Sequence, residues 1–245
     1  MSKKIWKKIE KSNLFTRLKL KLRQLIGTEP IFKIDLELSM SKQSGWSFFA
    51  PLINEKSIVY SMGICDDTGF EEDIINLFGA NVYAFDPTPH CLEWIKRHKL
   101  PEKFIFYPWA AAGKDGNIYL YPRLSSKGKK SKVMFTLLSE KTDDGIEVTA
   151  LTTSSMAKKL GHSHIDVLKM DIEGAEYDVI KSLISESSIR PNMILVEFHH
   201  RFKGLSKQDT KDAVYQLRQE GYKITDISIT GREMCFVYSP SDKNL

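Results

Sequence analysis

The chain of 245 residues is 42% hydrophobic and 27% charged, which is enough apolar sequence for one sizeable core and excludes wholesale disorder. Its net charge of +5 is unevenly placed, because residues 1–26 carry nine Lys or Arg against Glu10 alone (+8) and the remainder therefore sums to −3. No apolar run reaches the roughly 18 residues of a membrane span, and three distant cysteines without a C-x-x-C pair indicate neither a disulfide framework nor a zinc site.

Residues 1–27 predict a basic amphipathic helical leader. Apolar residues recur at helical spacing in two stripes, namely Ile5, Trp6 and Ile9, then Leu14, Leu18, Leu22 and Leu25. Such a helix either lies on an anionic membrane with its Lys and Arg on the phosphates, or docks on the domain with a solvated basic rim. Charges interrupt the leader, so it lacks the apolar stretch of a signal peptide. We therefore expect a cytoplasmic protein, with peripheral contact at the inner membrane surface through residues 1–26 under the first interpretation.

Residues 28–56 are expected to be a connecting segment that packs on the core, and residues 57–240 to be one domain. Strands are expected at 57–62, 81–85, 103–107, 118–121, 165–170, 193–198, 223–229 and 233–238, and helices around 74–78 and at 91–98, 154–160, 175–183 and 207–219. Apolar strands that alternate with helices predict a Rossmann-like α/β fold, a mostly parallel sheet covered on both faces. The polar, basic residues 122–145 predict a loop or lid.

Acidic residues follow several of the predicted strands. Asp86, Asp171 and Glu197 each stand at or just after a strand end, and Gly63 follows the first strand. Ligands of open parallel sheets bind at the carboxyl ends of the strands. Gly63 permits a close backbone approach, and an acid about 20 positions later can accept hydrogen bonds from a ribose diol. This pattern indicates an adenosine-containing cofactor.

The loop after Gly63 favours S-adenosylmethionine over NAD. The dinucleotide fingerprint G-x-G-x-x-G lacks two of its three glycines here, and Asp66 and Asp67 would repel a pyrophosphate. A cofactor with an ammonium and a sulfonium tolerates those carboxylates. Asp66 or Asp67 is therefore the expected partner of the cofactor's ammonium group.

Four segments resemble the signature motifs of FkbM-type methyltransferases, and the resemblance covers about residues 57–238. The segments are Leu168–Glu176, Ala84–Pro89, Leu195–Phe202 and Gly231–Glu233. The resemblance implies a class I methyltransferase domain with a seven-stranded sheet whose last strand is antiparallel. It also implies a cofactor site comprising Met62, Gly63, Ile64, Asp66, Asp86, Thr88, Trp109, Ala110 and Asp171. In one departure, Ser61 and Cys65 stand where the family's loop has an acidic residue and a glycine.

The resemblance further implies O-methylation of a hydroxyl, with a sugar or glycoconjugate as the small-molecule or glycan acceptor. The catalytic candidates are Asp171, Glu173, Glu197 and His199, of which Asp171 is best placed as a base. His199 with Glu197 and Asp171 is a conceivable metal set, but no ligand spacing indicates a metal, so none is predicted. The acidic domain without an aromatic-basic stripe argues against a nucleic-acid substrate. Two alternatives are a non-catalytic membrane-associated scaffold with a degenerate cofactor loop and an NAD-dependent oxidoreductase.

Overall fold

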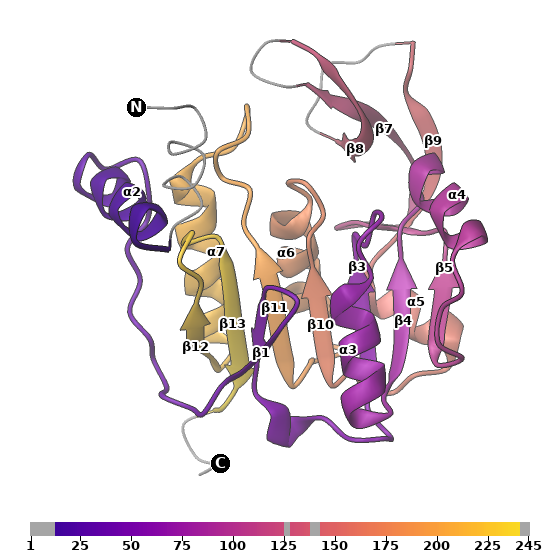
Figure 1. The fold of residues 1–245 in the computed structure, drawn as a ribbon, viewed down its shortest axis with the longest axis horizontal. Coiled ribbons are helices and arrows are strands. Elements are labelled where there is room, and N and C mark those ends of the chain that lie inside the picture. Colours follow the sequence, from indigo (N-terminus) through magenta and orange to yellow (C-terminus); the bar gives the residue numbers. More distant parts are fainter. Residues whose placement is uncertain (1–12, 125–127, 138–142, 241–245) are drawn as a thin grey trace, which may run out of the picture.

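The computed structural model describes residues 13–124, 128–137 and 143–240, apart from the side chains of residues 132–133. A seven-stranded sheet forms its centre, in the order β12-β13-β11-β10-β3-β4-β5 (Figure 1). The strands are β3 (Ile58–Met62), β4 (Asn81–Phe85), β5 (Phe104–Tyr107), β10 (Val167–Met170), β11 (Met193–Glu197), β12 (Tyr222–Ile227) and β13 (Glu233–Tyr238). Strand β13 runs antiparallel to the other six strands of this sheet. The predicted Rossmann-like sheet with an antiparallel last strand is therefore confirmed.

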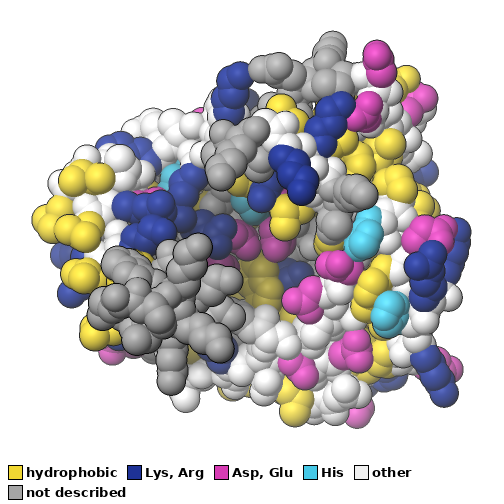
Figure 2. All heavy atoms as spheres, turned by 45° about the horizontal axis from the view of Figure 1, so that its top comes forward, with side chains coloured by type: hydrophobic (Ala, Val, Ile, Leu, Met, Phe, Trp, Pro, Cys, Tyr) yellow, Lys and Arg dark blue, Asp and Glu magenta, His cyan; other side chains and the backbone are white. Residues whose placement is uncertain are grey.

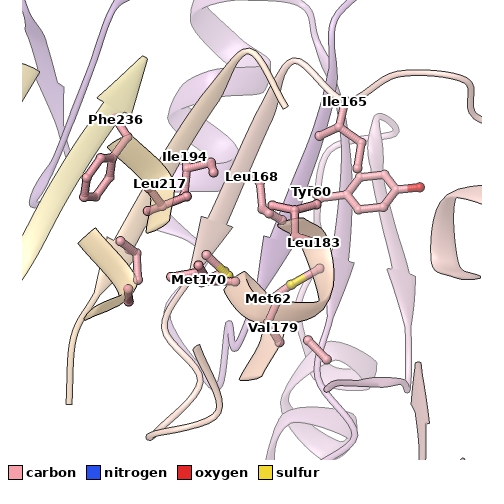
Figure 3. Close-up of a cluster of buried hydrophobic side chains, with 14 of the residues drawn as sticks. Tyr60, Met62, Ile165, Leu168, Met170, Val179, Leu183, Ile194, Leu217 and Phe236 are labelled. Atoms are coloured by element: carbon pink, nitrogen blue, oxygen red, sulfur yellow. The ribbon is translucent and has the colours of Figure 1, made fainter. Parts of the chain in front are cut away.

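Helices cover both faces of this sheet (Figure 1). They are α3 (Gly69–Phe78), α4 (Pro89–Arg97), α5 (Thr153–Leu160), α6 (Glu176–Glu186) and α7 (Lys207–Gln219). Successive side chains of β10 point to opposite faces, so Leu168 and Met170 pack with α5, α6 and α7, whereas Val167 packs in the cluster that includes α3. Figure 3 shows the first cluster, in which Val179 and Leu183 of α6 lie against the sheet. Burial on both faces explains why these strands are mostly apolar.

The segment before β3 contains a hairpin, β1 (Ser41–Gln43) and β2 (Trp46–Phe48), and a 3-10 turn, η1 (Ala50–Leu52). Phe48 is fully buried among the residues of α3. Upstream, both carboxylate oxygens of Asp35 accept hydrogen bonds at 2.8 Å from Arg218 of α7, and the Ile224 backbone N–H donates to Oδ2. These contacts attach residues 35–52 to the β12 edge of the central sheet and to α3.

The leader contains helix α2 (Asn13–Leu25), and its first stripe, Ile5, Trp6 and Ile9, lies outside the described residues. Gly27, with φ +72°, ends this helix together with a hydrogen bond from the Thr28 N–H to the Arg23 carbonyl. Leu20 lies against Gly231 in the turn between β12 and β13, so one face of α2 docks on the domain. Among the described residues, no helix is long and apolar enough to cross a membrane.

A second sheet stands above the carboxyl ends of the central strands (Figure 1). Its order is β6-β9-β7-β8, with β6 (Ala110–Ala111), β7 (Gly116–Leu124), β8 (Lys130–Thr136) and β9 (Ile146–Leu151). The prediction of a loop or lid over residues 122–145 is therefore wrong for much of its length. The polar first half of β8 suits an edge strand.

Candidate functional site

A cavity of about 210 Å³ opens between the carboxyl end of the central sheet and the β7–β8 hairpin; we call it the donor cavity. Figure 2 looks onto this edge, where acidic side chains surround a hollow with a hydrophobic floor. The lining residues are Gly63, Cys65, Asp66, Phe85, Asp86, Pro87, Thr88, Trp109, Ala110, Ala111, Ile118, Leu120, Met134, Phe135, Thr136, Leu137, Asp171, Ile172, Glu173 and Ala175. The cavity thus brings together the loops after β3, β4, β5 and β10, as expected for an open parallel sheet.

Gly63 is required by a contact between two of these loops. A Cβ atom at this position would lie 1.9 Å from the backbone oxygen of Asp171, and its φ of +79° disfavours other residues. The Gly63 N–H donates to the Phe85 carbonyl at 2.9 Å. Gly63 therefore lets the loop after β3 approach both the Asp171 backbone and the cavity.

Asp86 presents a carboxylate that is fixed in place by three donors. Its Oδ1 accepts hydrogen bonds from the N–H and hydroxyl of Thr88, at 2.9 and 2.6 Å, and its Oδ2 accepts one from the Cys65 N–H at 2.9 Å. Burial raises the pKa of Asp86, although these hydrogen bonds oppose the shift. A carboxylate has about four lone-pair positions, so Asp86 retains roughly one for a ligand hydroxyl.

The loop after β3 keeps its shape without the glycine that the resemblance leads us to expect. Cys65 adopts a left-handed conformation with φ 51°, the region that glycine enters most easily. Backbone strain of this kind collects at binding sites. Asp66 lines the cavity and its carboxylate lies 2.9 Å from His90 Nε2, whose hydrogen bond lowers the pKa of Asp66. Asp67 does not line the cavity, so Asp66 is the better placed of the two.

Ser61, which stands where the family's loop has an acidic residue, contacts an acid from another element. Ser61 donates a 2.5 Å hydrogen bond to Glu71 of α3, whose Oε1 also lies 3.2 Å from Lys169 Nζ. All three side chains are buried, and the lysine ammonium lies 5.1 Å from the ring centroid of Trp46. This network supports the loop after β3 from behind the cavity.

Stacked aromatic side chains form one wall of the cavity. The rings of Phe85 and Trp109 are nearly parallel, with centroids 6.1 Å apart, and Tyr107 stacks on Trp109 at 4.6 Å. Ala110 lies beside them on β6 and leaves room for a flat ligand ring. Of these, Trp109 and Ala110 are residues predicted from the sequence.

Met62 and Ile64, also predicted for the cofactor site, do not line the cavity. Both side chains are buried, Met62 among the residues of α6 and Ile64 among those of α3. Their backbone atoms remain at the cavity's edge, where the Met62 carbonyl accepts a hydrogen bond from the Asp171 N–H at 3.0 Å.

Sequence reasoning missed the residues of the second sheet that close the cavity. These are Ile118 and Leu120 of β7 and the run from Met134 to Leu137. The Thr136 hydroxyl donates to the Glu173 carbonyl at 2.7 Å, and Arg123 pairs with the Glu173 carboxylate at 2.8 Å. The alternation of apolar residues after Gly116 was the available signal, but it did not show where the hairpin would lie.

Next to the donor cavity is a group that we call the histidine cluster: Asp171, Glu176, Glu197 and His199. His199 is buried, and its Nε2 lies 3.5 Å from Asp171 Oδ1 and 3.9 Å from Glu197 Oε1. On its other side, Nδ1 lies 3.3 Å from Glu176 Oε1, which also accepts the His199 N–H at 2.7 Å. Three predicted catalytic residues thus meet, whereas Glu173 faces Arg123.

Burial by itself lowers the pKa of His199, but the hydrogen bond and charge of Glu176 outweigh it and raise that pKa to about 9. The imidazole is therefore a cation at neutral pH. Burial raises the pKa of Asp171, and burial together with the charge of Asp171 raises the pKa of Glu197 to about 7. Glu197 Oε1, the oxygen that faces His199, also pairs with Arg232. The cluster thus holds carboxylates that titrate closer to neutrality than usual.

Ligand atoms of Asp171, Glu197 and His199 lie within 4.8 Å of one another, close enough to hold a metal ion. The Arg232 guanidinium, which pairs with Glu197, adds a positive charge beside this position and opposes a further cation there.

The sequence is similar to several known proteins. Probable methyltransferase-like protein 24 of Rattus norvegicus is 24% identical over 158 residues, which are 64% of this chain and 36% of that protein. The Homo sapiens protein of the same name is 24% identical over 163 residues, 66% of this chain and 37% of that protein. The chain thus matches little more than a third of the length of these relatives.

A solved structure with a related arrangement is the pre-rRNA processing protein fibrillarin of Methanococcus jannaschii, with a TM-score of 0.46 and 12% identity over 83% of this chain and 72% of that one. The Methyltransferase FkbM domain family matches residues 56–224. Since this match covers well over half of the chain, the protein belongs to the FkbM methyltransferase domain family, whose methyl donor is S-adenosylmethionine.

Proposed function

We propose that the chain transfers the methyl group of S-adenosylmethionine to a hydroxyl oxygen of a sugar or glycoconjugate. The observation that carries this proposal is the position of Asp171, which lines the donor cavity and also lies 3.5 Å from His199 Nε2. A carboxylate between a donor site and a buried histidine is suited to remove a hydroxyl proton.

The donor cavity fits the donor's chemical groups. S-adenosylmethionine supplies a methyl group on a sulfonium. The free lone pair of Asp86 suits one ribose hydroxyl, the Trp109 and Phe85 rings offer a flat surface for adenine, and Asp66 offers a carboxylate for the ammonium. Because no described Lys or Arg lines the cavity, it favours a cationic ligand over a pyrophosphate and argues against the NAD alternative.

Asp171 is the proposed base. The acceptor hydroxyl would have to lie opposite the sulfonium, and an Oδ atom of Asp171 would take its proton as the new O–C bond forms, the methyl–sulfur bond breaks and S-adenosylhomocysteine leaves. The cationic His199, oriented by Glu176, stabilises the anionic form of Asp171 before transfer. Glu197 Oε1 lies 3.9 Å from His199 Nε2, beyond hydrogen-bond distance, so the proton is assigned to Asp171 alone. A base of this kind contributes roughly 10²–10⁴-fold to the rate.

The acceptor class rests on the resemblance stated from the sequence motifs, and the net acidity of the domain argues against a nucleic acid. Cys65, Cys91 and Cys235 are all unpaired, which suits a reducing compartment, so we place the protein in the cytoplasm.

We also propose that α2 lies on an anionic membrane surface. Leu14, Leu18, Leu22 and Leu25 form one stripe on this helix and are 79, 54, 53 and 82% exposed. Lys19, Lys21 and Arg23 lie between these leucines along the helix and complement anionic headgroups. The docked face with Leu20 leaves this stripe free to enter the bilayer interface.

The test of the main proposal is transfer of a radiolabelled methyl group from S-adenosylmethionine to a panel of sugar nucleotides, sugar phosphates and free sugars, with the product linkage determined by NMR. We expect an O-methyl sugar. A product methylated on nitrogen, or a chain that fails to bind S-adenosylhomocysteine at millimolar concentration, would overturn the proposal.

A further inference from the structure

A second cavity, of about 260 Å³, lies between α2 and the turn that joins β12 and β13; we call it the basic pocket. Its lining residues are Phe15, Thr16, Lys19, Leu20, Arg23, Arg201, Thr230 and Arg232. Four of these eight side chains are cationic, and no described acidic side chain is among them. Figure 2 shows Lys and Arg side chains gathered between the hydrophobic left edge of this face and its acidic centre.

The carboxylate of Glu29 positions two of the pocket's arginines, Arg23 and Arg201. Glu29 is buried, and its Oε1 accepts a 2.5 Å hydrogen bond from Arg201 Nε and lies 3.8 Å from Arg23 Nη1. The other Glu29 oxygen lies 2.9 Å from His200 Nε2. Because Glu29 contacts one edge of each guanidinium, other N–H groups of both remain for a ligand.

Arg232 joins the basic pocket to the histidine cluster. Its Nη1 pairs with Glu197, whereas its Nε is buried and has no hydrogen-bond partner. An unpaired buried donor costs free energy unless a ligand or water fills the position. Glu197 lies between Arg232 and His199, and His199 contacts Asp171, the proposed base.

The number and type of cations indicate the ligand. Three guanidinium groups, an ammonium and the Thr16 hydroxyl offer many donors in a small volume. Planar guanidinium groups match phosphate oxygens in pairs. The pocket remains net cationic, because its four cations outnumber the three carboxylates paired with them, Glu29, Glu197 and Glu233. A single carboxylate offers only two oxygens and one charge.

We propose that the basic pocket binds a phosphate or diphosphate group of the methyl acceptor, so that the acceptor is a phosphorylated or diphosphate-linked glycan. This inference rests on the proposed function, since it places the acceptor's anionic end beside the cluster that holds the base. The leader then contributes two cations, Lys19 and Arg23, to acceptor recognition.

The test is calorimetric titration of the full chain with inorganic pyrophosphate, with and without S-adenosylhomocysteine. The variant is Lys19→Gln with Arg23→Gln, and the matched control is Arg17→Gln with Lys21→Gln, which removes the same charge from the same helix outside the pocket. We expect the first pair to weaken pyrophosphate binding about tenfold or more, and the control pair less than about threefold. Equal losses in both pairs, or no binding to the native chain at 10 mM (an order-of-magnitude ceiling), would overturn the inference.

Two further binding measurements distinguish between possible ligands. Malonate that binds as tightly as pyrophosphate would contradict phosphate selectivity and so overturn the proposal. Competition between pyrophosphate and phosphatidylglycerol vesicles would identify a lipid phosphate as the source, and its absence a soluble acceptor. Pyrophosphate binding without S-adenosylhomocysteine binding would contradict only the proposed function, and the reverse result only this inference.

Discussion

The donor cavity and the basic pocket lie at the same edge of the molecule but have opposite charge. The donor cavity has Asp66, Asp86, Asp171 and Glu173 in its lining and no described Lys or Arg, whereas the basic pocket has four cations. Their border is the ion pair between Glu197 and Arg232. A cationic donor and an anionic acceptor need opposite surroundings, and the ion pair lets the two surroundings adjoin without an unpaired charge.

The two regions also differ in how the chain builds them. Strand-end loops of the central sheet, held by backbone contacts, supply most of the donor cavity's polar residues. The basic pocket joins a helix at residues 13–25 to loops near residues 201 and 230. Variants can therefore affect one region and spare the other, and the predictions below use this difference.

The largest effect is expected in the histidine cluster, for Asp171→Asn. Removing the base should lower methyl transfer by roughly 10²–10⁴-fold, because an amide cannot take the acceptor's proton. The affinity for S-adenosylhomocysteine should change less than about threefold, since Asp171 is one of many lining residues. Single-turnover transfer of labelled methyl is the measurement. Glu173→Gln is the control, and a larger loss there than at Asp171 would contradict the assignment.

Asp86→Asn should affect only the donor cavity. The amide turns one acceptor oxygen into a donor, which faces the N–H groups of Cys65 or Thr88 and loses a charge-assisted hydrogen bond to the ligand. We expect S-adenosylhomocysteine to bind roughly 10–100-fold more weakly, with pyrophosphate binding unchanged. Calorimetry of both ligands checks this result. A parallel loss of pyrophosphate binding would mean that the two regions do not act separately.

The histidine cluster predicts a pH dependence of stability. The folded pKa of His199, about 9, lies above the ordinary value of about 6.5, so its stabilisation is complete below pH of about 6.5 and is lost as the pH rises through about 9. The free energy of unfolding of the native chain should fall by something on the order of 2–3 kcal/mol between about pH 7 and pH 10, and this fall should be absent in His199→Gln. Urea unfolding across this range measures it, with exposed His164→Gln as the control. The same slope in native chain and His199→Gln would contradict the prediction.

The smallest effect concerns the leader beyond the basic pocket. Leu18→Glu should reduce co-sedimentation with phosphatidylglycerol vesicles by about threefold or more, because it places a charge in the stripe proposed to enter the bilayer. Leu77→Glu on α3 is a matched control, since the two leucines are 54 and 56% exposed. Pyrophosphate binding should be unchanged in both variants. Equal co-sedimentation of both would remove the membrane proposal and leave the basic pocket untouched.

Much of the donor cavity could be predicted from the sequence. The apolar strands and the acids that follow them identified Asp86 and Asp171, because the carboxyl ends of parallel strands always meet at one edge. The helix at 207–219 and the strands at 81–85 and 233–238 also have the predicted bounds. Local periodicity and strand ends are properties that neighbouring residues specify.

Other features were decided only by tertiary structure, because they join residues that are far apart in the chain. Residues 122–145, predicted to be a loop or lid, contain strand β8, and the β7–β8 hairpin lines the donor cavity because Thr136 and Arg123 bind the loop after β10. Packing of α3 on the sheet brings Glu71 against Ser61, ten residues away in the chain. The basic pocket exists only because α2 docks against Gly231, and no pattern within residues 13–25 encodes that contact.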